Sequence, residues 1–252
     1  MKISKYCASG NDFVIITAFS NKNRSLLAKK LCDRFNGVGA DGLIIILPDT
    51  NNDFKWEFYN SDGSVAKMCG NGARAAFMYA YENNLISKKA KFLSGAGVID
   101  GEICSFKNKN AEVKIKLTKH KVCLPKFNEL DLEWCFYDTG VPHLVSFVSD
   151  VSKFNLDICK VMRKKYNANV NFAQILDDKI LVRTFERGVE AETLACGTGM
   201  AASFYAAFKE GKIPPQISVY PTSGERLELS LKDGEIYFKG IVKHSFDAIF
   251  YE

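Results

Sequence analysis

Two cysteine-led segments of the sequence repeat one pattern of residue types. "CGNGARAAFMYAYE" begins at Cys69, and "CGTGMAASFYAAFK" begins at Cys196, 127 positions further along a chain of 252 residues. Each has a cysteine, a Gly-x-Gly turn and then an apolar run that favours a helix. Helix starts offer unpaired backbone N–H groups and a positive dipole end. A cysteine there is suited to carry a thiolate, and the neighbouring amides are suited to hold a carboxylate.

Two such thiols could invert a carbon atom that bears a carboxylate. One thiolate removes the proton, and a protonated thiol on the opposite face supplies another. The enolate-like charge that develops is stabilised by the helix starts in a site from which water is excluded. We therefore predict a carboxylate cradle of backbone amides from Gly70, Asn71, Gly197 and Thr198, and a lowered thiol pKa. We see no packing purpose for a repeated Gly-x-Gly, and we expect no cofactor and no metal.

Composition and charge argue against several other classes of protein. The net charge is +5, but Lys and Arg are scattered among Asp and Glu, so we expect no binding to nucleic acid or to a membrane. The sequence has neither a secretory signal pattern nor a long apolar run, which indicates a cytoplasmic protein with mostly reduced thiols. The remaining cysteines lack a glycine turn and zinc-type spacing, so we expect them to be structural. They are Cys7, Cys32, Cys104, Cys123, Cys135 and Cys159.

The two cysteine segments belong to an internal repeat. A shift of 127 residues aligns six identical pairs: Cys69 with Cys196, Gly70 with Gly197, Gly72 with Gly199, Ala75 with Ala202, Phe77 with Phe204 and Ala80 with Ala207. Strand-like patterns surround them, at 41–48, 54–60, 111–118, 179–185, 226–234 and 235–242. Because the helical segments carry almost no charge for three turns, each must be buried on all sides.

These patterns predict an α+β fold of two pseudo-symmetric domains. Each domain is expected to be a curled, mostly antiparallel β-sheet or barrel around its central apolar helix, with the active site in the cleft between them. The N-terminal half covers 1–115, with the C-terminal strand 241–252 returning to it, and the C-terminal half covers 116–240. A further helix over 24–34 has a polar face and is expected to lie outside.

Four blocks make the chain resemble the diaminopimelate epimerases, which are pyridoxal-independent enzymes of lysine and cell-wall precursor synthesis. The blocks are "GNDF" at 10–13, "NSDGSVAKMCGNGAR" at 60–74, "NVNF" at 169–172 and "ERGVEAETLACGTG" at 186–199. They occur in the family's order over nearly the whole chain. The resemblance implies a two-domain, cofactor-independent, homodimeric enzyme that converts LL-diaminopimelate into the meso form.

The resemblance also implies roles for individual residues. Cys69 and Cys196 match the family's acid/base pair, Glu186 belongs to the catalytic group and can take an ammonium, and His143 supports the site. The residues that match the carboxylate cradle are Gly70, Asn71, Gly197 and Thr198. Those that match the grip on the rest of the substrate are Asn11, Asn60, Asn169, Glu186 and Arg187. Amides and one arginine suit a distal ammonium and carboxylate.

The chain departs from the family pattern in two places. Val141 stands where the family commonly has Asn before the proline of "PH", and "YCASGNDF" stands where a His-Gly pair is frequent. The valine removes one expected substrate contact, and neither change touches the two thiols. His120 and His244 lie in lysine-rich, surface-like segments, and we predict no function for them.

Three other functions compete with this interpretation. A proline or hydroxyproline racemase shares the two-thiol mechanism, but a cyclic substrate has no distal group for Arg187 and Asn60 to hold. A cysteine phosphatase needs an arginine six positions after its cysteine, whereas Arg74 follows Cys69 by five. A redox-sensing binding module could pair Cys69 and Cys196 in a disulfide, but binding alone does not explain two thiols at two helix starts.

Overall fold

The computed structural model describes residues 1–117 and 119–251, which form two compact units. Unit 1 holds Met1–Lys116 and the chain from Lys239 onward, and unit 2 holds Leu117–Phe238. Strands dominate both units, and the described residues contain four α-helices, so the chain has the predicted α+β class. Thr118 and Glu252, at the ends of the expected strands 111–118 and 241–252, lie outside the described residues.

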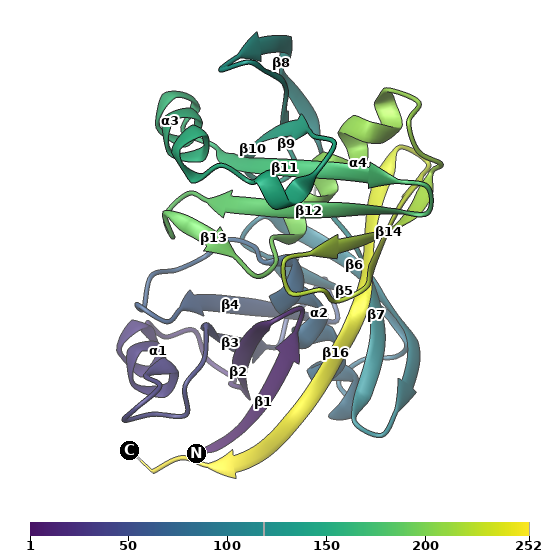
Figure 1. The fold of residues 1–252 in the computed structure, drawn as a ribbon. Coiled ribbons are helices and arrows are strands. Elements are labelled where there is room, and N and C mark those ends of the chain that lie inside the picture. Colours follow the sequence, from purple (N-terminus) through teal and green to yellow (C-terminus); the bar gives the residue numbers. More distant parts are fainter. Residues whose placement is uncertain (118, 252) are drawn as a thin grey trace. The chain divides into compact units, whose positions relative to one another are not determined.

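Unit 1 is a closed sheet around one helix (Figure 1). Its elements are β1 (Lys2–Ala8), β2 (Asn11–Thr17), α1 (Ser25–Cys32), β3 (Gly42–Leu47), β4 (Phe54–Asn60), α2 (Gly70–Glu82), β5 (Lys89–Ser94), β6 (Gly97–Lys107), β7 (Asn110–Lys116) and most of β16 (Glu235–Ile249). The strands follow one another from β1 to β7, β16 lies next to β7, and β16 also pairs antiparallel with β1. This last pairing closes the sheet and removes its open edges.

The helix inside unit 1 is α2, as its apolar composition predicts. Every residue from Gly70 to Ala80 is buried, and α2 packs against β1, β2, β3, β6 and β7. Phe77 on α2 packs edge-on against Phe54 and Phe92, which stack on each other at 4.7 Å. A Cβ at Gly101 on β6 would lie 2.6 Å from two carbons of the Phe77 ring, so only glycine leaves room for it. By contrast, α1 packs only one side against the sheet and lies outside, as predicted.

Among the residues that the structure describes, unit 2 is an open sheet with a helix packed on each face (Figure 1). Its elements are β8 (Lys121–Glu129), β9 (Leu132–Asp138), β10 (Pro142–Phe147), a short 3₁₀ turn (Val151–Lys153), α3 (Leu156–Tyr166), β11 (Asn169–Leu176), β12 (Lys179–Glu186), β13 (Ala191–Thr193), α4 (Gly197–Lys209), β14 (Gln216–Pro221) and β15 (Leu227–Lys232). The strand order is β15-β14-β12-β11-β10-β9-β8, and β13 pairs with β12. Helix α4 packs against β9, β10, β11, β12 and β14, so it is the counterpart of α2. The expected closure of the sheet around its central helix is therefore found in unit 1, where β16 pairs with β1, and not among the described strands of unit 2.

The two units repeat one order of elements. The series β1-β2-α1-β3-β4-α2-β5-β6 corresponds to β9-β10-α3-β11-β12-α4-β14-β15. Pairs β2–β3 and β10–β11 are both parallel, β3–β4 and β11–β12 are both antiparallel, and β4–β5 and β12–β14 are both parallel. Helices α2 and α4 therefore stand at the same point of the same topology, and so do α1 and α3.

Helix α3 is not among the elements expected from the sequence patterns. Its signals are present: the Asn155 side chain accepts hydrogen bonds from the N–H groups of Asp157 and Ile158, and basic residues fill the last turn. The helix ends at Asn167 in the left-handed conformation. The internal repeat also predicts it, because the corresponding segment 24–34 of the first half has a helical pattern.

None of the helices in the described part of the chain has the length and apolar content needed to cross a membrane.

The contact between Gly101 and Phe77 yields a stability prediction. Gly101→Ala should lower the free energy of unfolding by about 1–3 kcal/mol, because the new methyl group forces the buried ring to move. Urea unfolding measures this loss. In a Phe77→Leu background the smaller side chain leaves more room, so Gly101→Ala should lower the free energy of unfolding by less than it does in the wild type. An equal loss in both backgrounds would show that the two residues do not compete for space.

Candidate functional site

Both repeated cysteines lie at helix starts, as the sequence pattern predicts. Cys69 is the N-cap residue of α2, and its sulfur accepts a hydrogen bond from the Gly72 N–H at 3.4 Å. Cys196 is the N-cap residue of α4, and its sulfur lies 3.5 Å from the Thr198 hydroxyl oxygen. Each sulfur is therefore next to the first-turn amides of its own helix, which are buried in α2 and half-buried at Gly197 and Thr198 in α4.

In unit 1, Asn71 connects the helix start to strand β2. Its side-chain nitrogen donates to the Asn11 side-chain oxygen at 2.7 Å, and Asn11 donates in turn to Asp41 at 2.9 Å. The fully buried Arg74 donates to the Asn71 side-chain oxygen at 2.8 Å and to the Ser9 hydroxyl. The backbone amides of Gly70 and Asn71 thus belong to a helix start whose side chains are already fixed.

A cluster of charged residues holds the β2 end of this network. Arg34 bridges Asp12 at 2.9 Å and Asp41 at 2.8 Å, and Lys5 pairs with Asp12 at 2.9 Å. Asn60, at the end of β4, is exposed and donates to the Ser64 hydroxyl at 2.9 Å, in the loop that leads to α2. The structure thus links Asn11 and Asn71 directly, while Asn60 is tied to its own loop.

In unit 2, His143 connects strand β10 to the start of α4. Its Nε2 lies 2.8 Å from the Thr198 hydroxyl oxygen and 3.3 Å from the Asn169 side-chain nitrogen. The Asn169 side-chain oxygen accepts the Arg187 backbone N–H at 2.8 Å, and the Arg187 guanidinium donates to the Asn167 carbonyl at 2.9 Å. One chain of contacts therefore joins Arg187, Asn169, His143, Thr198 and Cys196.

Two buried residues of this network, Asn171 and Thr184, are not among the residues expected from sequence. Asn171 lies on β11 beside His143, 3.1 Å from its Nδ1, and Thr184 on β12 donates to the Asn171 side-chain oxygen at 2.8 Å. Asn171 could have been found in "NVNF", because residues two apart on a strand face the same side. A Cβ at Gly199 would lie 2.3 Å from the Asn171 side-chain oxygen, so this glycine does have a packing purpose. The opposite expectation was wrong here, although a Cβ at Gly72 would meet its neighbours at ordinary distances.

The environment of Cys196 raises its pKa, against the expectation of a lowered one. Burial and the Glu186 carboxylate raise the pKa of the Cys196 thiol, and they outweigh the Thr198 hydroxyl and the Gly199 N–H, which lower it. Burial also raises the pKa of Glu186, whose side chain accepts a hydrogen bond from Thr193 at 2.7 Å. A helix start alone does not decide the protonation of a thiol when burial and a neighbouring carboxylate oppose it.

His143 is a neutral group at physiological pH. Its side chain is completely buried, and burial lowers its pKa to about 3, with the nearby Arg187 charge acting in the same direction. An imidazole in this state acts through hydrogen bonds and not through charge.

The expectation that His244 lies at the surface was wrong. Its side chain is only 8% exposed, stacks on Tyr6 at 4.6 Å, and lies 3.2 Å from carboxylate oxygens of Glu82 and Asp247. His120 packs against the ring of Tyr205 at 4.0 Å. These contacts pack both rings against other side chains, and we assign neither histidine a place in the site.

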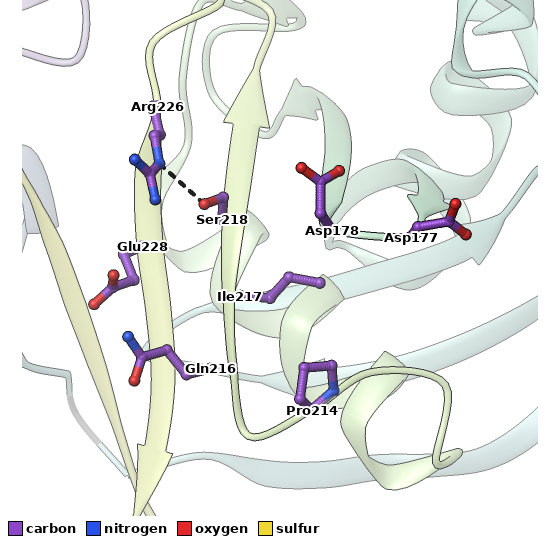
Figure 2. A pocket seen from close by; sticks show the side chains of 8 residues that line it. All are labelled: Asp177, Asp178, Pro214, Gln216, Ile217, Ser218, Arg226 and Glu228. Carbon is purple, nitrogen blue, oxygen red and sulfur yellow. Dashed lines mark hydrogen bonds between the residues drawn. The ribbon is translucent and has the colours of Figure 1, made fainter.

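A surface hollow of about 300 Å³ lies elsewhere in unit 2 (Figure 2). Figure 2 shows Asp177 and Asp178, from the β11–β12 turn, on one side and Arg226 on the other, where Arg226 donates to the Ser218 hydroxyl at 3.0 Å. The described residues that line it include none of the predicted site residues. The hollow therefore adds no chemistry to the predicted site.

The comparisons with known proteins identify the family. The model of the family "Diaminopimelate epimerase" matches residues 3–121 and 135–244. The chain is 51% identical over 249 residues to the diaminopimelate epimerase of Campylobacter jejuni (strain 81-176), and 52% identical over 249 residues to that of a Nitratiruptor species. Each alignment covers 98% of both chains.

The fold is shared more widely. The crystal structure of a probable proline racemase from Agrobacterium radiobacter K84 superposes with a TM-score of 0.75 at 12% identity, covering 99% of this chain and 92% of that one. At this identity the likeness concerns the fold alone.

The buried histidine predicts an acid-sensitive fold. Because the folded-state pKa of His143 is about 3, below its ordinary value of 6.5, the unfolded chain binds the proton first as the pH falls. The stability that depends on neutral His143 is complete above about pH 6.5 and declines below it, by at most about 1.4 kcal/mol per pH unit. Urea unfolding of the wild type and of His143→Gln between about pH 7.5 and pH 5 measures the slopes. Because the variant lacks this titrating group, its free energy of unfolding should fall less steeply with decreasing pH, by the uptake of up to about one proton on unfolding. Equal slopes in the two proteins would contradict the low pKa of His143.

Proposed function

Because the chain belongs to the diaminopimelate epimerase family, we propose that it converts LL-diaminopimelate into the meso isomer by proton transfer between the thiols of Cys69 and Cys196. The chain is thus an isomerase of lysine biosynthesis. The roles of the two cysteines and of the first-turn amides are inferred from the two helix starts, whereas the roles of the other residues follow from the resemblance to the family.

One observation carries the mechanism: each unit presents a cysteine as the N-cap of its buried central helix, at the same point of the same topology. A structural cysteine needs only an apolar environment, as Cys32 and Cys159 have in the two cores. A thiol beside the first-turn amides of a helix in both halves of a repeat instead suits a reaction that needs two acid/base groups.

The proposed reaction moves one proton on each face of the α carbon. The thiolate of one cysteine removes the α proton and becomes a thiol, and the thiol of the other donates its proton to the opposite face and becomes a thiolate. The negative charge that develops on the substrate carboxylate is stabilised by the amides of Gly70 and Asn71 and of Gly197 and Thr198. The mechanism thus conserves protons, and the reverse reaction uses the same two thiols with their roles exchanged.

The environment of Cys196 supports its role as the proton donor in the resting enzyme. Burial and the Glu186 carboxylate raise the pKa of this thiol, so it holds its proton at neutral pH. Cys69 then acts as the base in the first direction of the reaction. When Cys196 has given its proton to the α carbon, the thiolate that remains is stabilised by the Thr198 hydroxyl and the Gly199 N–H, which both lower the pKa.

The far end of the substrate carries its own ammonium and carboxylate. We assign the grip on this end to Asn11, Asn60, Asn169 and Arg187, with Glu186 available to the ammonium. Asn169 and Asn11 already have partners of their own, at 2.8 Å from the Arg187 N–H and 2.9 Å from Asp41, which orient both amides before the substrate arrives.

The proposal includes a homodimer in the cytoplasm, with the two units forming the site together. These points rest on the resemblance to the family. Size-exclusion chromatography with light scattering tests the dimer.

Replacement of either cysteine should abolish epimerisation. Cys69→Ala and Cys196→Ala should each lower kcat by at least about 1000-fold, the scale of an essential acid or base, while the fold is retained. The assay follows the meso isomer formed from LL-diaminopimelate, together with deuterium uptake at the α carbon in heavy water. Cys104→Ala serves as the matched control, because Cys104 is an exposed cysteine outside both helix starts.

Near-normal turnover in either active-site variant would overturn the two-thiol mechanism. Deuterium uptake by proline in place of diaminopimelate would overturn the substrate assignment and favour the racemase alternative.

The valine at position 141 leads to a prediction that restoring asparagine changes the substrate affinity only modestly. Val141 precedes Pro142 and accepts the Thr139 N–H through its carbonyl at 3.2 Å, so its side chain can be changed without loss of that bond. Val141→Asn should change KM by less than about tenfold and leave kcat nearly unchanged, since one hydrogen bond contributes about 1 kcal/mol. Arg187→Met should raise KM more strongly. A loss of kcat in Val141→Asn as large as that in Arg187→Met would place position 141 near the reacting carbon.

A further inference from the structure

The orientation of the Asn171 side chain is settled by its partners. The side chain is completely buried, and its nitrogen lies 2.7 Å from the Leu144 carbonyl oxygen, which can only accept. Its oxygen accepts the Thr184 hydroxyl at 2.8 Å. One hydrogen of the Asn171 amide nitrogen is therefore used by Leu144, and the other remains for the neighbour at 3.1 Å, His143 Nδ1.

This contact determines which nitrogen of His143 carries the proton. A donor from Asn171 faces Nδ1, so Nδ1 must be the unprotonated nitrogen that accepts. The ring is neutral and therefore has one N–H, which stands on Nε2. Nε2 lies 2.8 Å from the Thr198 hydroxyl oxygen and donates to it.

The second amide near the ring does not compete for Nε2. The Asn169 side-chain oxygen accepts the Arg187 N–H, which fixes its nitrogen on the other side. That nitrogen lies 3.3 Å from both the Pro142 carbonyl oxygen and Nε2. Because Nε2 already carries a proton, Asn169 donates to the carbonyl.

The protonated Nε2 of His143 also sets the direction in which the Thr198 hydroxyl donates. Its oxygen accepts from Nε2, so its own hydrogen points away from His143, and the Cys196 sulfur lies 3.5 Å from the same oxygen. A hydroxyl that donates to sulfur stabilises the thiolate.

We propose that Asn171 is a positioning residue for Cys196: it holds His143 in the Nε2–H tautomer, and His143 in turn directs the Thr198 hydroxyl at the Cys196 sulfur. This inference rests on the proposed function only in that Cys196 is one of the two acid/base thiols. Asn171 itself touches neither the sulfur nor the substrate.

The tautomer can be observed directly in the wild-type protein. The chain has three histidines, so ¹⁵N-histidine labelling gives few signals, and His143→Gln identifies the signals of His143. We expect an unprotonated Nδ1 and a protonated Nε2 that do not change between about pH 6 and pH 9. A proton on Nδ1, or a ring that titrates in this range, would overturn the proposal.

The link to the sulfur is tested by the reactivity of Cys196 towards iodoacetamide, followed for its own peptide by mass spectrometry. Asn171→Asp presents a carboxylate to Nδ1 and draws the ring proton there, so the Thr198 hydroxyl turns to donate to Nε2. The alkylation rate of Cys196 near pH 8 should fall about tenfold, and kcat should fall by a similar factor with KM within about twofold. Thr198→Val should reduce the alkylation rate as much while leaving the His143 tautomer unchanged, and Thr198→Ser should restore it.

A double variant separates the proposed route from a simple charge effect. The new carboxylate in Asn171→Asp could also slow alkylation through its charge alone. If the effect runs through the hydroxyl, Asn171→Asp/Thr198→Val will be no slower than Thr198→Val. If the two losses add, Asn171 does not act through Thr198 and the proposal fails.

The outcomes also separate this proposal from the function. If the tautomer and the alkylation rates follow expectation but diaminopimelate is not epimerised, the function is wrong and the positioning of Cys196 stands. If epimerisation proceeds and Asn171→Asp alters neither readout, the function stands and Asn171 has only a packing role.

Discussion

The structure depends on packing an almost uncharged helix against the sheet of each unit. Such a helix still has backbone N–H groups at its first turn that the helix itself cannot satisfy, and leaving them unpaired away from water is costly. In α2 and α4 this first turn follows a cysteine N-cap in each case. Because the N–H groups of the first turn need hydrogen-bond acceptors, each helix start is a site that stabilises a negative charge.

Each helix start is held by a polar side chain from the equivalent strand. In unit 1, Asn11 on β2 accepts from Asn71, the second residue of α2, at 2.7 Å. In unit 2, His143 on β10 contacts Thr198, the second residue of α4, at 2.8 Å. The repeat therefore keeps the link between strand and helix while the chemical groups differ. Buried polar groups need hydrogen-bond partners, so a different side chain at one position requires different neighbours as well. The same backbone topology is therefore stabilised by a different polar network in each unit.

Sequence patterns predict what is periodic or repeated, and they fail where the outcome depends on distances through space. The central helices and their cysteine N-caps follow from the repeat and from the lack of charge, and α3 could have been found from Asn155 and the same repeat. The burial of His244 depends on Tyr6, Glu82 and Asp247, and Glu82 lies 162 positions away from it in the sequence. No local pattern reports such contacts.

The pKa of Cys196 is a second property that no local sequence pattern reports, and it bears on the proposed reaction. A helix start favours a thiolate in either unit, so two equivalent cysteines in equivalent surroundings would favour the same protonation state. A reaction that needs one thiol and one thiolate requires the surroundings to differ. They differ at the last residue of the corresponding strands, which is Asn60 on β4 and Glu186 on β12. Burial and the Glu186 carboxylate both raise the pKa of Cys196, whereas the amide of Asn60 at the equivalent strand end carries no charge. The surroundings of Cys196 therefore oppose the thiolate that a helix start favours, and they do so through groups that the repeat does not share.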